Sequence, residues 1–196
     1  MRRIIKIGGS MLLRSNLATA VNHWMDAHPA DQTMIIIGGG KLIDAVRELD
    51  QQHAMDPQQT HWMCVDLLTA TASFAADVLG CPLIKTEQAW KEMLHLGKML
   101  PSSQMLSLPT VITPAVFYNK STNVPDTRIP HDWRTTTDSI AALLAHQVDA
   151  DELVLLKSCP IDPQMSLVQL AEAGNVDEAL PEVARELRSI RIEKLD

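Results

Sequence analysis

The chain has few cysteines and lacks a long apolar run, and both absences narrow what the protein can be. Its three cysteines, Cys64, Cys81 and Cys159, are odd in number and far apart. They form neither a disulfide framework nor a zinc-ligand spacing, which favours a reducing, cytoplasmic setting. The longest apolar stretches fall short of the roughly 20 residues that span a membrane. The strand pattern after Met1 is also too short for the apolar core of a secretory signal, so no membrane partner is expected.

Positive charge is also scarce. Lysine and arginine total 17 against 24 aspartate and glutamate residues, a net charge of −7. This balance argues against nucleic acid as the main partner, whereas a small anionic metabolite could still be held by local cations and backbone N–H groups. The chain has no internal repeat, and 46% of its 196 residues are hydrophobic. These values predict a single domain over residues 1–196, with two small domains as the alternative.

Glycine is concentrated in two clusters. Gly8–Ser10 follows the β-branched run Ile4–Ile7, and Gly38–Gly40 follows Met34–Ile37. A helical pattern comes after each cluster. Glycine lets a backbone approach a ligand closely, and the free N–H groups at a helix start attract anions. The pattern predicts two turns that face each other across one sheet and hold two anionic groups, as a phosphoryl-transfer enzyme requires.

The remaining periodicity predicts an α/β protein. Strands are expected at Arg3–Ile7, Thr33–Ile37, Leu83–Lys85, Gln104–Leu108, Thr110–Pro114, Glu152–Lys157 and Ile190–Lys194. Helices are expected at Leu17–Ala27, Lys41–His53, His61–Leu79 and Ser139–Val148. Strands that alternate with helices indicate a three-layer sandwich with a largely parallel central sheet.

Two segments suggest more than a structural role. His61–Leu79 is apolar on most sides, which is typical of a helix buried in the core or in a subunit interface, so we expect a homodimer or higher homo-oligomer. The long irregular stretch Tyr118–Thr136 is predicted to be a lid or substrate loop, with a mobile surface loop as the alternative. Its arginines Arg128 and Arg134, with His131, could close over an anionic substrate, since arginine forks suit phosphate. A solvated loop face is the competing interpretation.

Two common phosphate-binding motifs are excluded. Gly40 and Lys41 suggest a Walker A loop, but its first glycine would fall on Ile35 and its Ser/Thr position holds Leu42. A dinucleotide fingerprint would need its third glycine where Ile43 stands.

The motifs that remain resemble the amino acid kinase superfamily. The first strand of that family ends in Lys-x-Gly-Gly-Ser, its second ends in a triple glycine, and a later helix opens on Asp among small residues. The matching positions here are Lys6, Gly8, Gly9, Ser10, Gly38, Gly39, Gly40, Thr137, Asp138 and Ser139. Within the superfamily the chain is most similar to a short subgroup that phosphorylates aminomethyl-furanmethanol phosphate in methanofuran biosynthesis. The segments that carry this similarity are residues 38–47, 61–66, 100–102, 131–139 and 176–178.

The resemblance implies a kinase that uses ATP, with Mg²⁺ carried by the nucleotide and no separate protein metal site. Lys6 would contact the transferred phosphoryl group, and Asp138 would order that lysine. Gly8–Ser10 would serve the phosphoryl group, while Gly38–Gly40 would hold the acceptor. His61 could face the acceptor, although a buried histidine with satisfied hydrogen bonds is the stronger single interpretation. The nucleotide would be bound by Thr137, Lys157, Ser158 and Asp162.

The chain departs from the family on the nucleotide side. Residues 157–162 read Lys-Ser-Cys-Pro-Ile-Asp where relatives carry Asp-Val-Asp-Gly-[Val/Ile]-Tyr, and the later Gly-Met-x-x-Lys segment has no match. Three functions therefore follow from the sequence. The preferred one is a kinase of a phosphate monoester. The others are a kinase of an amino-acid carboxylate that yields an acyl phosphate, and a non-catalytic ligand-binding member of the fold.

Overall fold

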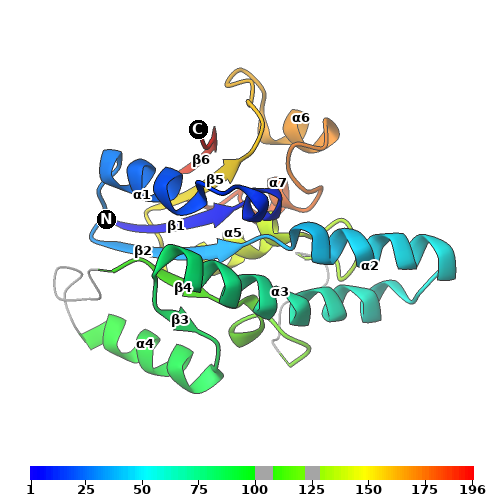
Figure 1. The fold of residues 1–196 in the computed structure, drawn as a ribbon, viewed down its shortest axis with the longest axis horizontal. Helices are drawn as coiled ribbons and strands as arrows, with labels where there is room; N and C mark the ends of the chain where they lie inside the picture. The colour runs from blue at the N-terminus through cyan, green and yellow to red at the C-terminus, as the bar shows by residue number, and fades with distance from the viewer. Residues whose placement is uncertain (100–107, 122–128) are drawn as a thin grey trace.

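A computed structural model describes residues 1–99, 108–121 and 129–196, and its centre is a six-stranded sheet (Figure 1). The strand order is β3-β4-β2-β1-β5-β6, and every pair is parallel. The strands are β1 (Arg2–Ile7), β2 (Gln32–Ile37), β3 (Leu83–Ile84), β4 (Thr110–Ile112), β5 (Glu152–Lys157) and β6 (Ile190–Lys194). Because all strands are parallel, their carboxyl ends lie along one edge of the sheet, where the glycine turns begin.

Helices connect the strands and cover both faces of the sheet. The α-helices are α1 (Leu17–Ala27), α2 (Gly40–His53), α3 (Pro57–Leu79), α4 (Glu87–Met99), α5 (Thr137–Gln147), α6 (Leu167–Glu172) and α7 (Leu180–Val183). Two 3-10 turns, η1 (Gly9–Leu13) and η3 (Pro114–Val116), complete the described elements. In Figure 1, α2 and the first half of α3 project together from one end of the sheet.

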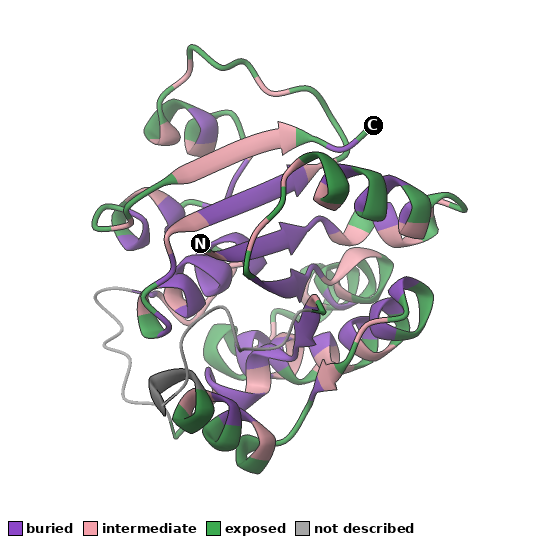
Figure 2. Cartoon of the chain, turned by 90° about the vertical axis from the view of Figure 1, so that its left-hand side faces the viewer, coloured by how far each residue is buried: buried purple, intermediate pink, exposed green. Residues whose placement is uncertain are grey.

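Side chains that alternate along the strands build a core on each face. Ile4 and Ile36 pack with α5 and the first half of α3, whereas Ile5 and Ile35 pack with α1 and the second half of α3. Figure 2 shows the central strands buried and the edge strand β6 half-buried. This arrangement confirms the three-layer α/β sandwich with a parallel central sheet that the sequence predicts.

Several boundaries differ from those predicted. Helix α3 begins four residues early because Asp56 Oδ1 accepts a 2.8 Å hydrogen bond from the Gln59 N–H, and Pro57 occupies the first helical position. Strand β4 ends at Ile112, and Pro114 then opens η3. Of the strand predicted at Gln104–Leu108, residues 104–107 lie outside the described part, and Leu108 forms a bend.

The sequence did not predict the bounds of three helices, α4, α6 and α7. Helix α6 begins with a capping box. The Ser166 Oγ accepts a hydrogen bond from the Gln169 N–H, and the Gln169 side-chain oxygen accepts one from the Ser166 N–H. Both short helices, α6 and α7, lie after β5, where the periodicity spans too few residues to be recognised. Among the described helices, α3 alone has the length and composition of a membrane-spanning segment, and 44% of its most apolar window is buried within the fold.

Candidate active site

The two glycine turns touch each other at the carboxyl edge of the sheet. The Gly38 N–H donates to the Ile7 carbonyl at 2.9 Å and the Gly8 N–H donates to the Leu156 carbonyl at 3.1 Å, so both turns continue the strand pairing. A Cβ atom on Gly9 would lie 2.1 Å from the Gly40 nitrogen, and one on Gly38 would lie 2.5 Å from the Gly9 nitrogen. Only glycine permits this approach, so the turns meet more closely than the sequence alone implied.

Lys6 and Asp138, the two predicted catalytic residues, form an ion pair beside these turns. Lys6 is near the end of β1, and Asp138 lies in the first turn of α5. The Lys6 Nζ lies 2.8 Å from Asp138 Oδ1, and the two side chains are only 7% and 4% exposed. The fold therefore brings the two strongest candidates from the sequence into direct contact.

Lys157, at the end of β5, is the third member of this cluster. Its Nζ lies 2.7 Å from Asp138 Oδ2. Burial would raise the pKa of Asp138, but the charges of Lys6 and Lys157 outweigh burial and hold that pKa below its usual range. Burial, followed by the nearby Lys6 charge, lowers the pKa of Lys157. One carboxylate thus holds two ammonium groups at the edge where the glycine turns meet.

Asp177 positions the helix that carries Asp138, and the sequence analysis missed this role. Its Oδ2 accepts hydrogen bonds from the Thr136 N–H at 2.8 Å, the Thr136 hydroxyl at 2.9 Å and the Ser139 N–H at 3.0 Å. Its Oδ1 accepts from the Ser139 hydroxyl and from the Leu180 N–H. Burial, and then the Asp138 charge, raise the pKa of Asp177. The bonds join segments about 40 residues apart, so no local pattern reveals them.

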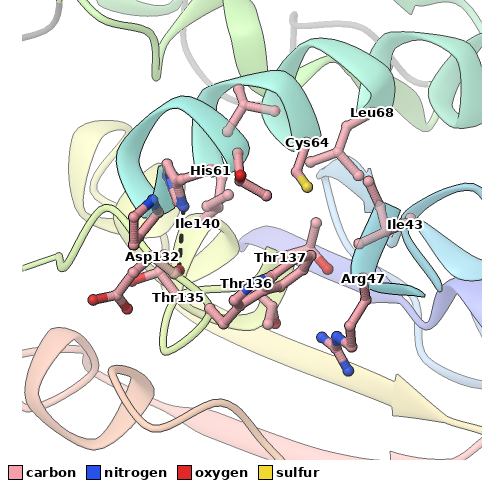
Figure 3. Close-up of a pocket in the computed structure, with 15 residues that line it drawn as sticks. Ile43, Arg47, His61, Cys64, Leu68, Asp132, Thr135, Thr136, Thr137 and Ile140 are labelled. Atoms are coloured by element: carbon pink, nitrogen blue, oxygen red, sulfur yellow. Dashed lines mark hydrogen bonds between the residues drawn. The ribbon is translucent and has the colours of Figure 1, made fainter. Parts of the chain in front are cut away.

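A cavity opens beside the second glycine turn. It lies between α2, α3 and the segment that leads into α5, and it is partly open to solvent (Figure 3). Its wall is largely apolar, from Ile43, Cys64, Val65, Leu68, Trp133 and Ile140. Gly39 lines it as well, which makes the cavity continuous with the turn predicted to hold an acceptor.

His61 lines this cavity, but both of its ring nitrogens have partners. Nε2 lies 2.9 Å from the Tyr118 hydroxyl, and Nδ1 lies 3.3 Å from the Asp132 carbonyl. Burial lowers the pKa of His61 to about 4, so the ring is neutral at pH 7. These contacts describe a buried histidine with satisfied hydrogen bonds, the stronger of the two interpretations from sequence.

Of the other predicted loop residues, the two that the structure describes, His131 and Arg134, do not line the cavity. Arg134 is exposed, and its guanidinium donates hydrogen bonds to both carboxylate oxygens of Asp132. The His131 ring packs against Trp62, with 4.6 Å between ring centroids. Arg128 lies outside the described residues. Among the described residues, the cation that lines the cavity is Arg47, which was not predicted as a site residue from the sequence.

The predicted nucleotide-binding residues do not lie together. Thr137 lines the cavity, on the acceptor side. Ser158 lies beside the first glycine turn, with its Oγ 3.1 Å from Ser10 Oγ. Asp162 is exposed and accepts a hydrogen bond from the Gln164 N–H, as a turn-forming aspartate does. Among the described residues, no group of three His, Cys, Asp or Glu side chains is arranged to hold a metal ion.

Comparison with solved structures finds the same fold in nucleotide and amino-acid kinases. The whole chain matches 90% of a uridylate kinase from Archaeoglobus fulgidus, with 16% identity and a TM-score of 0.58. It also matches 90% of a UMP kinase from Ureaplasma parvum, with 16% identity and a TM-score of 0.61. An aspartate kinase from Synechocystis matches 99% of this chain over 38% of its own length, with 13% identity and a TM-score of 0.61. No curated protein sequence matches the chain significantly.

These distant structures show the fold, whereas a family model assigns the chain to a family. The model of the amino acid kinase family matches residues 1–160, which include both glycine turns, Lys6, Asp138 and Lys157. The chain therefore belongs to the amino acid kinase family and is an ATP-dependent phosphotransferase of that family.

Proposed function

We propose that the protein transfers the γ-phosphoryl group of ATP to a small phosphate monoester and forms a diphosphate. The observation that carries this proposal is the pair of lysines on Asp138, beside two touching glycine turns and an adjoining cavity. Phosphoryl transfer depends on positioning and charge neutralisation, and this group of residues is suited to both. The preferred acceptor is aminomethyl-furanmethanol phosphate or a close relative, on the strength of the sequence resemblance.

The residues of the site fit the phosphates of a nucleotide. ATP, when bound, supplies the phosphoryl group, with Mg²⁺ held mainly by phosphate oxygens and water. Lys6 and Lys157 would neutralise the charge on the transferred group, and Asp138 keeps both ammonium groups in place. The backbone of Gly8 and Gly9 would lie close to the phosphates, where a side chain would obstruct them.

A cation at the cavity favours a phosphate over a carboxylate acceptor. The Arg47 guanidinium lies 4.7 Å from the Trp133 ring centroid and lines the cavity, which also contacts the glycine turn. Arginine is suited to bind phosphate oxygens in pairs. Arg134 is engaged by Asp132, so among the described arginines we assign the acceptor phosphate to Arg47.

A thermal melting curve with Mg-ATP, followed by a coupled assay of ADP formation, tests the proposal. A ligand at a hundredfold excess over its Kd stabilises the folded state by about 2.7 kcal/mol, which raises the melting temperature measurably. Among small phosphates and amino acids, we expect turnover with a phosphate monoester. No shift at millimolar Mg-ATP would contradict the kinase, and a shift without turnover on any acceptor would favour the non-catalytic alternative.

We also propose that the chain forms a homo-oligomer through α3, in a cytoplasmic setting. Phe74 and Val78 lie one helical turn apart on α3 and are 52% and 38% exposed. Sedimentation at micromolar concentration is expected to show a dimer or larger species, and Phe74→Glu to reduce it to monomer because a charge there opposes burial. Leu96→Glu, at a 52% exposed leucine on α4, is the matched control and should leave the assembly intact. A wild-type chain that sediments as a monomer would overturn the proposal.

A further inference from the structure

Two buried hydroxyl groups in the cavity wall have no hydrogen-bond partner. Thr60 on α3 is 1% exposed, and Thr135, just before α5, is 5% exposed. Both residues line the cavity, and the Oγ1 of each is without a partner in the described structure. Leaving a buried hydroxyl unpaired costs free energy, so proteins seldom retain one without a reason.

Two other hydroxyls of the same helix do have partners. Thr71 Oγ1 donates to the Leu68 carbonyl at 3.1 Å, and Ser73 Oγ donates to the Thr69 carbonyl at 2.9 Å. The backbone of α3 therefore offers acceptors to its hydroxyls. The free hydroxyl of Thr60 belongs to the part of the helix that faces the cavity. The missing partner is thus specific to the cavity and not a general feature of this helix.

The cavity has a polar group at each end and an apolar wall between them. Figure 3 shows Ile43 and Arg47 at one end and Thr135 with His61 at the other. The indole of Trp133 is fixed by a 2.6 Å hydrogen bond from its Nε1 to Asp50 Oδ2, beneath the Arg47 guanidinium. Both nitrogens of His61 are engaged, and Arg134 bonds both carboxylate oxygens of Asp132, which lines the same end. The threonine hydroxyls therefore remain as the groups that a ligand can pair there.

From these features we infer that Thr60 and Thr135 determine which acceptor the protein takes. The acceptor has an anionic end held between the Gly39 turn and Arg47, a flat apolar body of ring size, and a hydrogen-bonding substituent at the far end that the two hydroxyls bind. A small aliphatic phosphate is too short to reach both hydroxyls and would leave the apolar wall uncovered. An unpaired buried hydroxyl costs free energy, so the site would bind such a phosphate less tightly than a ligand that pairs both hydroxyls. This inference rests on the proposed function, because it assigns the cavity to the acceptor.

The test measures binding by calorimetry, without nucleotide, for three phosphates of equal charge. The probes are 3-(hydroxymethyl)benzyl phosphate, benzyl phosphate and glycerol 3-phosphate. We expect the hydroxymethyl compound to bind about tenfold more tightly than benzyl phosphate, as one or two new hydrogen bonds allow. Glycerol 3-phosphate should bind most weakly. Thr60→Val and Thr135→Val, which remove the hydroxyl but keep the shape, should abolish the tenfold preference and leave the affinity for benzyl phosphate unchanged.

A control variant separates recognition from stability. In the free protein, Thr60→Val should melt no lower than the wild type, since the lost hydroxyl had no partner. Thr71→Val loses a bonded hydroxyl on the same helix, so it should melt lower yet keep the ligand preference.

Three results would overturn the inference: a preference that survives in both cavity variants, equal affinities for all three phosphates, or no binding of either ring compound. Because nucleotide is absent, a retained preference without phosphoryl transfer would refute the proposed kinase reaction alone. Phosphoryl transfer without the preference would refute this inference alone.

Discussion

Replacing Lys6 by alanine is expected to lower the rate of phosphoryl transfer on the order of a thousandfold while the protein stays folded. The rate falls because a cation aligned with the transferred phosphoryl group stabilises the transition state, and this stabilisation is worth about a thousandfold in the rate of phosphoryl transfer. The fold should survive because Asp138 keeps its 2.7 Å contact with Lys157, so the buried carboxylate is not left unpaired. Steady-state ADP release measures the rate, and circular dichroism with a melting curve checks the fold.

Lys91→Ala provides the matched control for this variant. Lys91 is on α4 and 70% exposed, and among the described residues it pairs with Glu87, so its loss should change neither rate nor stability by a measurable amount. If Lys6→Ala kept more than a tenth of the wild-type rate, the assignment of Lys6 to the transferred group would be wrong.

Replacing Gly9 by alanine is expected to destabilise the protein by at least about 3 kcal/mol and to abolish activity. The added Cβ would lie 2.1 Å from the Gly40 nitrogen and 2.7 Å from the Gly38 carbonyl carbon. These neighbours are backbone atoms, so no side-chain rotation relieves the overlap. The two turns must separate, which disturbs both ends of the proposed site together. Denaturant unfolding with the activity assay measures both effects.

Alanine variants of two other glycines serve as controls for this prediction. Gly8→Ala places its Cβ 3.4 Å from the Leu156 carbonyl oxygen, at the edge of ordinary contact, and should cost far less stability. Gly174 has a φ of +71° and open space around it, so Gly174→Ala should cost only about 1–2 kcal/mol, for the left-handed backbone, and leave activity intact. Equal stabilities for the Gly9 and Gly174 variants would show that the turns do not touch.

Local patterns predicted much of the fold. Strand β5 and helix α1 have the bounds expected from sequence, because alternating or β-branched runs and helical apolar spacing are properties of short windows. Helix α4 was missed, since the sequence analysis did not recognise a helical pattern in that segment. The start of α3 was misplaced because a cap at Asp56 is a polar signal outside the apolar pattern.

The residues of the candidate site also fall into those that the sequence predicts and those that it does not. Lys6 and Asp138 follow from motifs that lie beside glycine turns or at a helix start. Arg47 and Thr60 sit within ordinary helices, and nothing in their neighbours distinguishes them from surface or core residues. Their significance depends on what lies across the cavity, which involves segments far away in the chain.

The sequence by itself determined the alternation of strands and helices, the two glycine turns and the exclusion of Walker and dinucleotide loops. Tertiary structure decided that Gly9 lies against Gly40, that Lys157 joins Lys6 on Asp138, and that Asp177 holds the start of α5. The physical reason is the parallel sheet. Its crossovers bring the ends of β1, β2 and β5 to one edge, so groups separated by more than a hundred residues share one buried charge cluster whose pairings no short stretch of sequence encodes.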